Sequence, residues 1–83
     1  MALPEKLKAE VSAIVADVAE VEIEEVLPES RLEDLGIDSL GGLRIVAAVE
    51  KRFGLVIGED EIARIRTMPD VFALVDSHAG EVE

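Results

Sequence analysis

The sequence contains no cysteine, tryptophan or tyrosine, and only two phenylalanines among its 83 residues. Without cysteine the chain forms no disulfide or thiolate metal site, and thiol catalysis is excluded. With so few aromatic rings the core must consist of Val, Ile, Leu and Ala, which favours small packed helices over a sandwich. No apolar run approaches the roughly 20 residues that cross a bilayer, and no signal peptide is recognisable. We expect one domain over residues 1–83, monomeric and cytoplasmic, without a membrane partner.

Positive charge is also scarce, with eight Lys and Arg against 19 Asp and Glu, a net charge of −11. Binding to nucleic acid requires clustered cations, so this class of function is excluded. Partners with basic surfaces are the natural expectation for such a chain. The acids also keep a small domain soluble, so charge alone identifies no partner.

Hydrophobic spacing predicts an all-α protein, a small four-helix bundle. The first helix is expected over residues 4–19, followed by a long ordered loop over residues 20–38 that contains Pro28. The loop residues expected to face the core are Val21, Ile23, Val26, Leu32, Leu35 and Ile37. A loop of this length in a small domain is typically functional or packed by its own side chains.

The second helix is predicted over residues 39–53, with Gly54 as its C-terminal stop. Its expected apolar stripe consists of Leu40, Leu43, Val46, Ala47 and Phe53. After an apolar connector over residues 55–57, Glu59, Asp60 and Glu61 favour the start of a short third helix, with Ile62 and Ile65 as its buried points. The last helix is expected to begin after Thr67 and to run to about His78, with residues 79–83 frayed.

The sequence contains little that indicates catalysis or metal binding. Its single histidine, His78, is interpreted as a helix-end residue, because no nucleophile and base occur in a recognisable pattern. The acidic residues do not follow the calcium-loop pattern, and no glycine-rich phosphate loop is present. We therefore expect no catalytic residue and no metal ligand.

The four serines differ in their suitability for carrying a phosphate. Ser12 falls inside a helix, Ser30 follows Glu29 in the acidic loop, and Ser77 lies near the C-terminal end of a helix, which disfavours negative charge. Ser39 follows Asp38, a favourable N-cap residue, and would occupy the first position of the second helix. Only Ser39 therefore lies where free backbone N–H groups and the helix dipole favour an attached phosphate.

Two consecutive glycines, Gly41 and Gly42, come near the start of the same helix. Each costs on the order of 1 kcal/mol relative to alanine in a helix interior. The pair is a tolerated weakness, a relief of crowding, or bare backbone that lets a partner enzyme approach Ser39. The sequence leaves these alternatives open.

The segment Asp34-Leu35-Gly36-Ile37-Asp38-Ser39-Leu40 resembles the modification site of acyl carrier proteins. Chain length, acidity, helix order and the opening Thr67-Met68-Pro69-Asp70-Val71 of the last helix extend the resemblance over nearly the whole sequence. The resemblance implies that a phosphopantetheinyl transferase attaches 4′-phosphopantetheine from coenzyme A to Ser39. The thiol of this arm would then hold a thioester for an acyl- or aminoacyl-loading enzyme and for downstream synthase enzymes with basic docking patches. The protein itself would not be an enzyme.

The resemblance also implies a partner-docking surface around the modified serine. Its expected residues are Asp38, Leu40, Leu43, Arg44, Glu50 and Ile62. Fatty-acid carriers usually have acidic residues near the start of the second helix, where this chain has Gly41 and Arg44. An arginine five residues after the serine is similar to peptidyl carriers, although those commonly have histidine where this chain has Asp38.

We interpret the sequence as a free-standing acyl carrier of a specialised polyketide or fatty-acid-like pathway. One alternative is a free-standing peptidyl (aminoacyl) carrier of nonribosomal peptide synthesis. The alternative from another class is an acidic helical adaptor that binds a partner without being modified.

Overall fold

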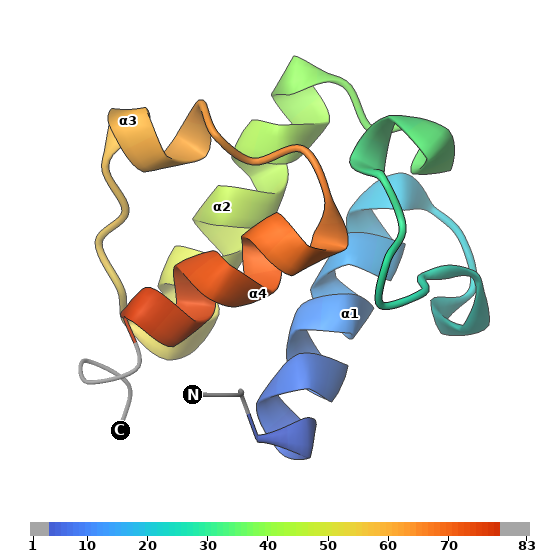
Figure 1. Cartoon of the computed structure of the whole chain (residues 1–83), viewed down its shortest axis with the longest axis horizontal. Helices are drawn as coiled ribbons and strands as arrows, with labels where there is room; N and C mark the ends of the chain where they lie inside the picture. Colours follow the sequence, from blue (N-terminus) through green and yellow to red (C-terminus); the bar gives the residue numbers. More distant parts are fainter. Residues whose placement is uncertain (1–3, 79–83) are drawn as a thin grey trace.

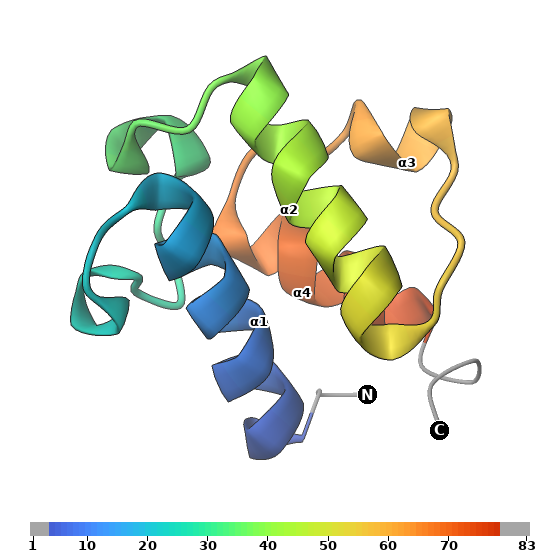
Figure 2. The same ribbon diagram turned by 180° about the vertical axis from the view of Figure 1, so that it is seen from behind.

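The computed structural model describes residues 4–78, which fold into helices around one apolar core (Figure 1). The helices are α1 (Glu5–Ala19), α2 (Ser39–Phe53), α3 (Glu59–Ile62) and α4 (Met68–Ser77). Two 3₁₀-helices, η1 (Ile23–Glu25) and η2 (Leu32–Leu35), lie in the long connection between α1 and α2. In Figure 1 α4 crosses in front of α2, and Figure 2 shows α2 from the opposite side, with α3 beside it. The all-α four-helix bundle, the long loop and the short third helix are confirmed.

The helix ends also agree with the sequence, because local chemistry determines them. At the end of α2, Gly54 adopts a left-handed conformation (φ 70°) and its N–H donates to the carbonyl of Glu50 at 2.8 Å. At the start of α4, the Asp70 N–H donates to Thr67 Oγ1 and the Thr67 N–H donates to Asp70 Oδ2. This reciprocal capping box satisfies two backbone donors. The expected frayed end at 79–83 lies outside the described residues.

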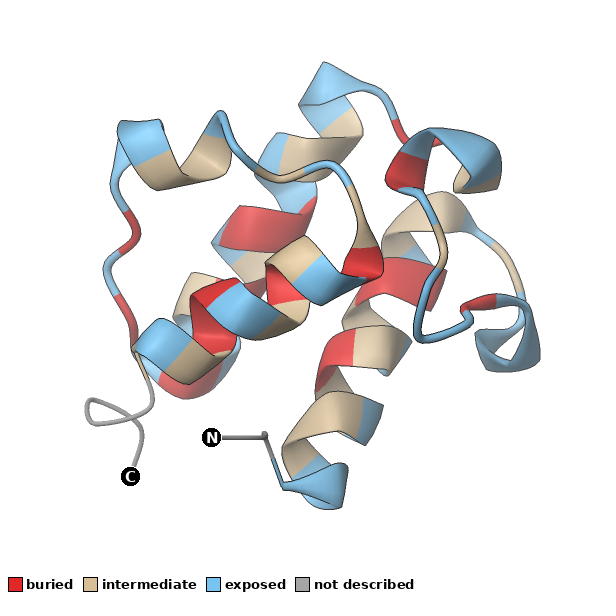
Figure 3. Cartoon of the chain, in the orientation of Figure 1, coloured by how far each residue is buried: buried red, intermediate tan, exposed pale blue. Residues whose placement is uncertain are grey.

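The apolar core is aliphatic apart from Phe53 and Met68, as the composition predicts (Figure 3). Helix α1 contributes Val11, Val15 and Ala16, and α4 contributes Met68, Val71, Leu74 and Val75. From α2 the buried residues are Ile45, Val46, Val49 and Phe53. No helix within residues 4–78 combines the length and apolar character needed to cross a bilayer.

The predicted apolar stripe of α2 is wrong for three of its five residues. Leu40 and Leu43 are 57% and 49% exposed, and Ala47 is exposed too. Helix α2 carries two apolar stripes at helical spacing, and the one that contains Ile45 and Val49 packs into the core. Periodicity alone does not show which of two stripes a neighbouring helix covers. Two large apolar side chains beside Ser39 are therefore left at the surface.

The long loop is held by buried side chains and by hydrogen bonds to the segment before α4. Leu32 and Ile37 are buried, as is Val26, whereas Ile23 is 43% exposed, so its predicted role in the core is wrong. The Leu32 N–H donates to the Arg66 carbonyl at 3.0 Å, and the Met68 N–H donates to the Ser30 carbonyl at 2.8 Å. These bonds attach the loop to the segment before α4. They fix the position of residues that precede Ser39.

Helix α3 is connected to the end of α4 through Glu61. Its Oε2 accepts from the Gly58 N–H at 3.1 Å, and its Oε1 lies 2.9 Å from Nε2 of His78. The hydrogen bond from Gly58, and next that from His78, lower the pKa of the Glu61 carboxyl below its ordinary value of 4.5. His78 thus contacts a carboxylate of α3, in agreement with its expected position at a helix end.

A pH prediction follows from Glu61. Because its pKa is lower in the folded state, its stabilising contribution is complete above the unfolded value and is lost as pH falls through the folded value, below 4.5. Glu61→Gln should therefore reduce the loss of stability in this acidic range. Urea midpoints measured between about pH 6 and pH 3 test this, with Glu59→Gln as the matched control on the same helix. Equal pH slopes in the two variants would contradict the prediction.

Candidate functional site

Ser39 is the first residue of α2, directly after the N-cap Asp38. The Asp38 Oδ1 accepts from the Gly41 N–H at 2.9 Å, and the Asp38 carbonyl accepts from the Gly42 N–H at 2.9 Å. Asp38 and Ser39 are both exposed, at the end of α2 that joins the long loop (Figure 2). The predicted cap and the predicted helix start are confirmed.

This geometry favours a phosphate attached to the Ser39 hydroxyl. The first N–H groups of a helix have no intrahelical acceptor. The Gly41 N–H donates to the Asp38 side chain, so the N–H groups of Ser39 and Leu40 are available to a phosphate. The positive end of the helix dipole points to the same place. A phosphodiester on Ser39 would therefore meet both free donors and a favourable field.

The other serines are less suited to modification. Ser30 Oγ accepts from the Leu27 N–H at 2.9 Å, and Ser77 Oγ donates to the Leu74 carbonyl at 2.8 Å. Ser12 is half-buried inside α1. Only Ser39 combines exposure with a helix N-terminus within residues 4–78.

The two glycines after Ser39 have different surroundings. A Cβ on Gly41 would lie 2.7 Å from Cγ2 of Ile37, which is a buried side chain, so this glycine relieves crowding. A Cβ on Gly42 would meet nothing within 4 Å. Of the alternatives that the sequence leaves open, relief of crowding applies to Gly41 alone.

Alanine substitutions at the two glycines should therefore change stability in opposite directions. Gly42→Ala should raise the free energy of unfolding by about 0.5–1 kcal/mol through helix propensity. Gly41→Ala should lower it by about 1 kcal/mol, because overpacking against Ile37 exceeds the gain in propensity. Urea unfolding of the unmodified protein measures both changes. A Gly41→Ala protein as stable as Gly42→Ala would show that Ile37 moves without cost.

A groove of about 580 Å³ opens beside Ser39, between the start of α2, the end of the long loop and the segment around α3. Ile37, Leu43, Ile62 and Ile65 provide apolar lining. Arg31, Glu33, Asp38 and Arg66 provide charged lining. The sequence does not reveal this groove, because its walls come from three separate segments.

The structure brings most of the predicted docking residues to the surface near Ser39. Leu40, Leu43 and Arg44 are exposed on α2, and Ile62 is half-buried across the groove from Leu43. Glu50 differs, because its Oε2 accepts from the Ile57 N–H at 2.8 Å and it is half-buried. Glu50 thus has a structural role in holding the connector after α2.

No group of three or more potential metal ligands is found among residues 4–78. His78, the one side chain of the sequence with an ordinary pKa near neutrality, lies with its Nε2 2.9 Å from Oε1 of Glu61. The geometry around Ser39 supports attachment of a group to its exposed hydroxyl at the start of α2.

Comparisons with known proteins agree with this geometry. Residues 9–75 match the family model described as a phosphopantetheine attachment site. The chain is 39% identical over 69 residues to the acyl carrier protein of Helicobacter hepaticus, covering 82% of this chain and 91% of that protein. It is 40% identical over 73 residues to 3-methylorcinaldehyde synthase of a Phoma species, covering 88% of this chain but 3% of that protein. The crystal structure of an acyl carrier protein from Thermotoga maritima superposes with a TM-score of 0.80 at 29% identity, covering 95% of this chain and 93% of that one.

Proposed function

Because the chain belongs to the acyl carrier protein family, whose members hold cargo on a covalent 4′-phosphopantetheine arm, we propose that Ser39 bears this arm. The observation that carries the proposal is the exposed Ser39 hydroxyl at the first position of α2, beside the groove. Proteins of this family are carriers and not catalysts, and phosphopantetheinyl transferases and synthase enzymes are their general partners. A tethered thioester acts by raising the effective concentration of its cargo.

The test is a mass measurement after incubation with coenzyme A and a broad-specificity phosphopantetheinyl transferase. We expect a gain of one arm per chain. A folded protein that gains no mass would overturn the proposal and would favour the unmodified acidic adaptor.

We propose that the cargo is an acyl intermediate of a specialised polyketide or fatty-acid-like pathway. Two observations support this assignment. A similar segment occurs in the 3-methylorcinaldehyde synthase of a Phoma species and in a non-reducing polyketide synthase of Hypocrea jecorina. The match covers 3% of each of these proteins. The acids usual in fatty-acid carriers are also replaced at Gly41 and Arg44. The mass of the group bound to the arm after purification from the native cell tests the assignment.

The second candidate is a peptidyl (aminoacyl) carrier, favoured by the exposed Arg44 five residues after Ser39. An aminoacyl group found on the arm would support this candidate and contradict the acyl assignment. The monomeric state, the cytoplasmic location and the single carrier domain over residues 1–83 stay predictions.

In this proposal the groove beside Ser39 binds part of the cargo. Its lining by Leu43, Ile62 and Ile65 suits the apolar part of an acyl chain. Side-chain NMR signals of these residues should shift when the arm carries an acyl group and not when its thiol is free. Unchanged signals would show that the cargo stays in solvent.

A further inference from the structure

Charge is divided along the chain at Ser39. Residues 20–38, which precede it, carry eight Asp and Glu against one Lys or Arg. Residues 39–66, which include α2 and α3, carry four Asp and Glu against five Lys and Arg. In a chain with a net charge of −11, cations therefore outnumber anions by one in the segment that begins at the proposed attachment site.

Some of the charged side chains in residues 39–66 have partners within the fold. Two of the four acids in residues 39–66, Glu50 and Glu61, accept hydrogen bonds from the backbone within the fold. One of the five cations, Arg52, is paired with Glu10 of α1 at 2.6 Å. Among the described residues, the other four cations form no ion pair; they are Arg44, Lys51, Arg64 and Arg66. The charge of Arg64 nevertheless helps to lower the pKa of the Glu61 carboxyl.

These cations adjoin an exposed apolar stripe. On α2 five of the seven exposed residues recur at spacings of three, one, three and four; they are Leu40, Leu43, Arg44, Ala47 and Lys51. Helical geometry places all of them on one face, opposite the buried Ile45 and Val49. Arg66 shares the groove with Ser39 and Leu43, so the segment after α3 continues this surface.

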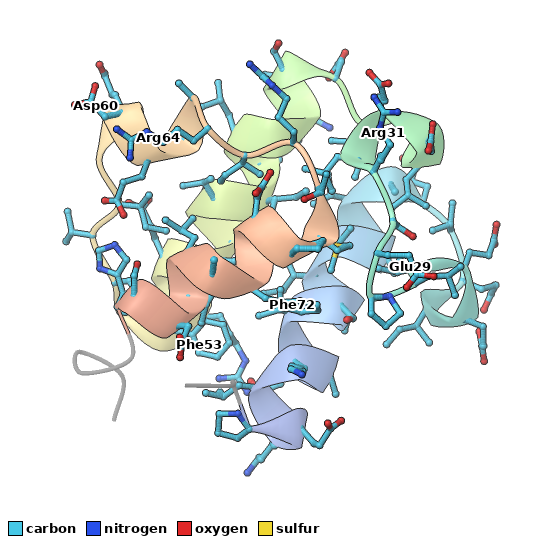
Figure 4. All side chains as sticks on the ribbon, in the orientation of Figure 1. Glu29, Arg31, Phe53, Asp60, Arg64 and Phe72 are labelled. Atoms are coloured by element: carbon cyan, nitrogen blue, oxygen red, sulfur yellow. The ribbon has the colours of Figure 1, made fainter. Side chains whose placement is uncertain are left out.

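The views of the molecule agree with this arrangement. Figure 2 shows α2 and α3 side by side. The long loop lies on the opposite side of α2, near its N-terminal end. In Figure 4 Arg64, just after α3, lies beside Asp60 of α3, whereas Glu29 lies in the long loop on the opposite side of the molecule. The long loop and α3 thus lie on different sides of the N-terminal end of α2.

We propose that the partner enzymes of this carrier present a docking surface of two signs. Lysine and arginine face residues 20–38, whereas aspartate and glutamate face the exposed side of α2 that carries Arg44 and Lys51. Apolar side chains between these two parts of the partner cover Leu40 and Leu43. This inference rests on the proposed function, since it concerns enzymes that meet the arm on Ser39. Complementary charge of two signs fixes the orientation of an encounter complex and disfavours a uniformly basic partner, which Arg44 and Lys51 repel.

The experiment uses two helical peptides as probes of the surface. Both have leucine at the same positions, and the remaining positions carry glutamate in one peptide and lysine in the other. Each is titrated at low ionic strength into the ¹⁵N-labelled protein that carries the arm. The glutamate peptide should shift amide signals of α2, and the lysine peptide those of residues 20–38. Shifts in the same segment with both peptides, or no binding of the glutamate peptide, would overturn the inference.

Matched variants separate local charge from net charge. Arg44→Glu should weaken binding of the glutamate peptide about three- to tenfold, and Arg44→Gln should weaken it less. Lys6→Glu makes the same change of charge on α1, outside the surface, and should leave binding unchanged. An equal loss of affinity for the glutamate peptide in Lys6→Glu would show that the net charge of the protein alone determines binding. That result would overturn the inference. Arg66→Glu serves as a second charge reversal if Arg44→Glu does not fold.

The same samples keep this inference distinct from the proposed function. A protein that gains the arm but binds both peptides in one segment contradicts the division of the surface alone. A protein that binds each peptide in its expected segment but gains no arm contradicts the proposed function alone.

Discussion

Ser39→Ala should abolish the gain of mass from coenzyme A and a phosphopantetheinyl transferase, while the free energy of unfolding changes by less than about 0.5 kcal/mol. Within residues 4–78, no other hydroxyl lies at an exposed helix N-terminus where the arm could be attached. Stability is preserved because the Ser39 side chain is exposed and the cap of α2 depends on Asp38, which accepts from Gly41. Mass spectrometry and urea unfolding of the same preparation measure the two quantities.

Controls at other serines make the prediction specific. Ser77→Ala removes a hydroxyl that donates to Leu74, and Ser30→Ala removes one that accepts from Leu27. Both proteins should gain one arm, although Ser30→Ala should be less stable because the Leu27 N–H loses its acceptor. An arm on the Ser39→Ala protein would place the attachment site elsewhere. A Ser39→Ala protein that does not fold would show that this serine is structural.

Much of the fold was predictable because short-range chemistry determines it. The ends of α2 and α4 follow from Asp38, Gly54 and Thr67, each of which acts on backbone groups within four residues. The same local argument predicted that Ser39 begins α2. The family resemblance then connected this position with a phosphopantetheine arm.

What the sequence did not predict depends on contacts between distant segments. The groove beside Ser39 is built from Arg31, Ile37, Leu43 and Ile65, whose proximity only the fold reveals. Glu50 was predicted as a docking residue, but its carboxylate holds the Ile57 N–H seven residues away. The uneven distribution of charge on the two sides of Ser39 can be read from the sequence. Which of these charged side chains face a partner depends on their contacts within the fold, and only the structure gives these contacts.

The choice between the two apolar stripes of α2 is the sharpest of these differences. If Leu43 were buried, its replacement by alanine would cost about 2–5 kcal/mol. It is 49% exposed, so its loss removes little buried surface. This side chain is therefore available at the surface beside Ser39, where the proposed docking surface needs it.

Ile45→Ala should therefore lower the free energy of unfolding by about 2–5 kcal/mol, whereas Leu43→Ala should lower it by less than about 1 kcal/mol. Ile45 is 1% exposed within the core, and its truncation leaves a cavity between α2 and its neighbours. The total stability expected of a domain this size is only about 4–12 kcal/mol, so the loss would be severe. Urea unfolding followed by circular dichroism measures both, with Ile45→Val, at about 0.5–1.5 kcal/mol, available if the alanine variant does not fold. Equal losses at the two positions would mean that α2 turns its other stripe to the core, and the docking surface proposed around Leu43 and Arg44 would then be wrong.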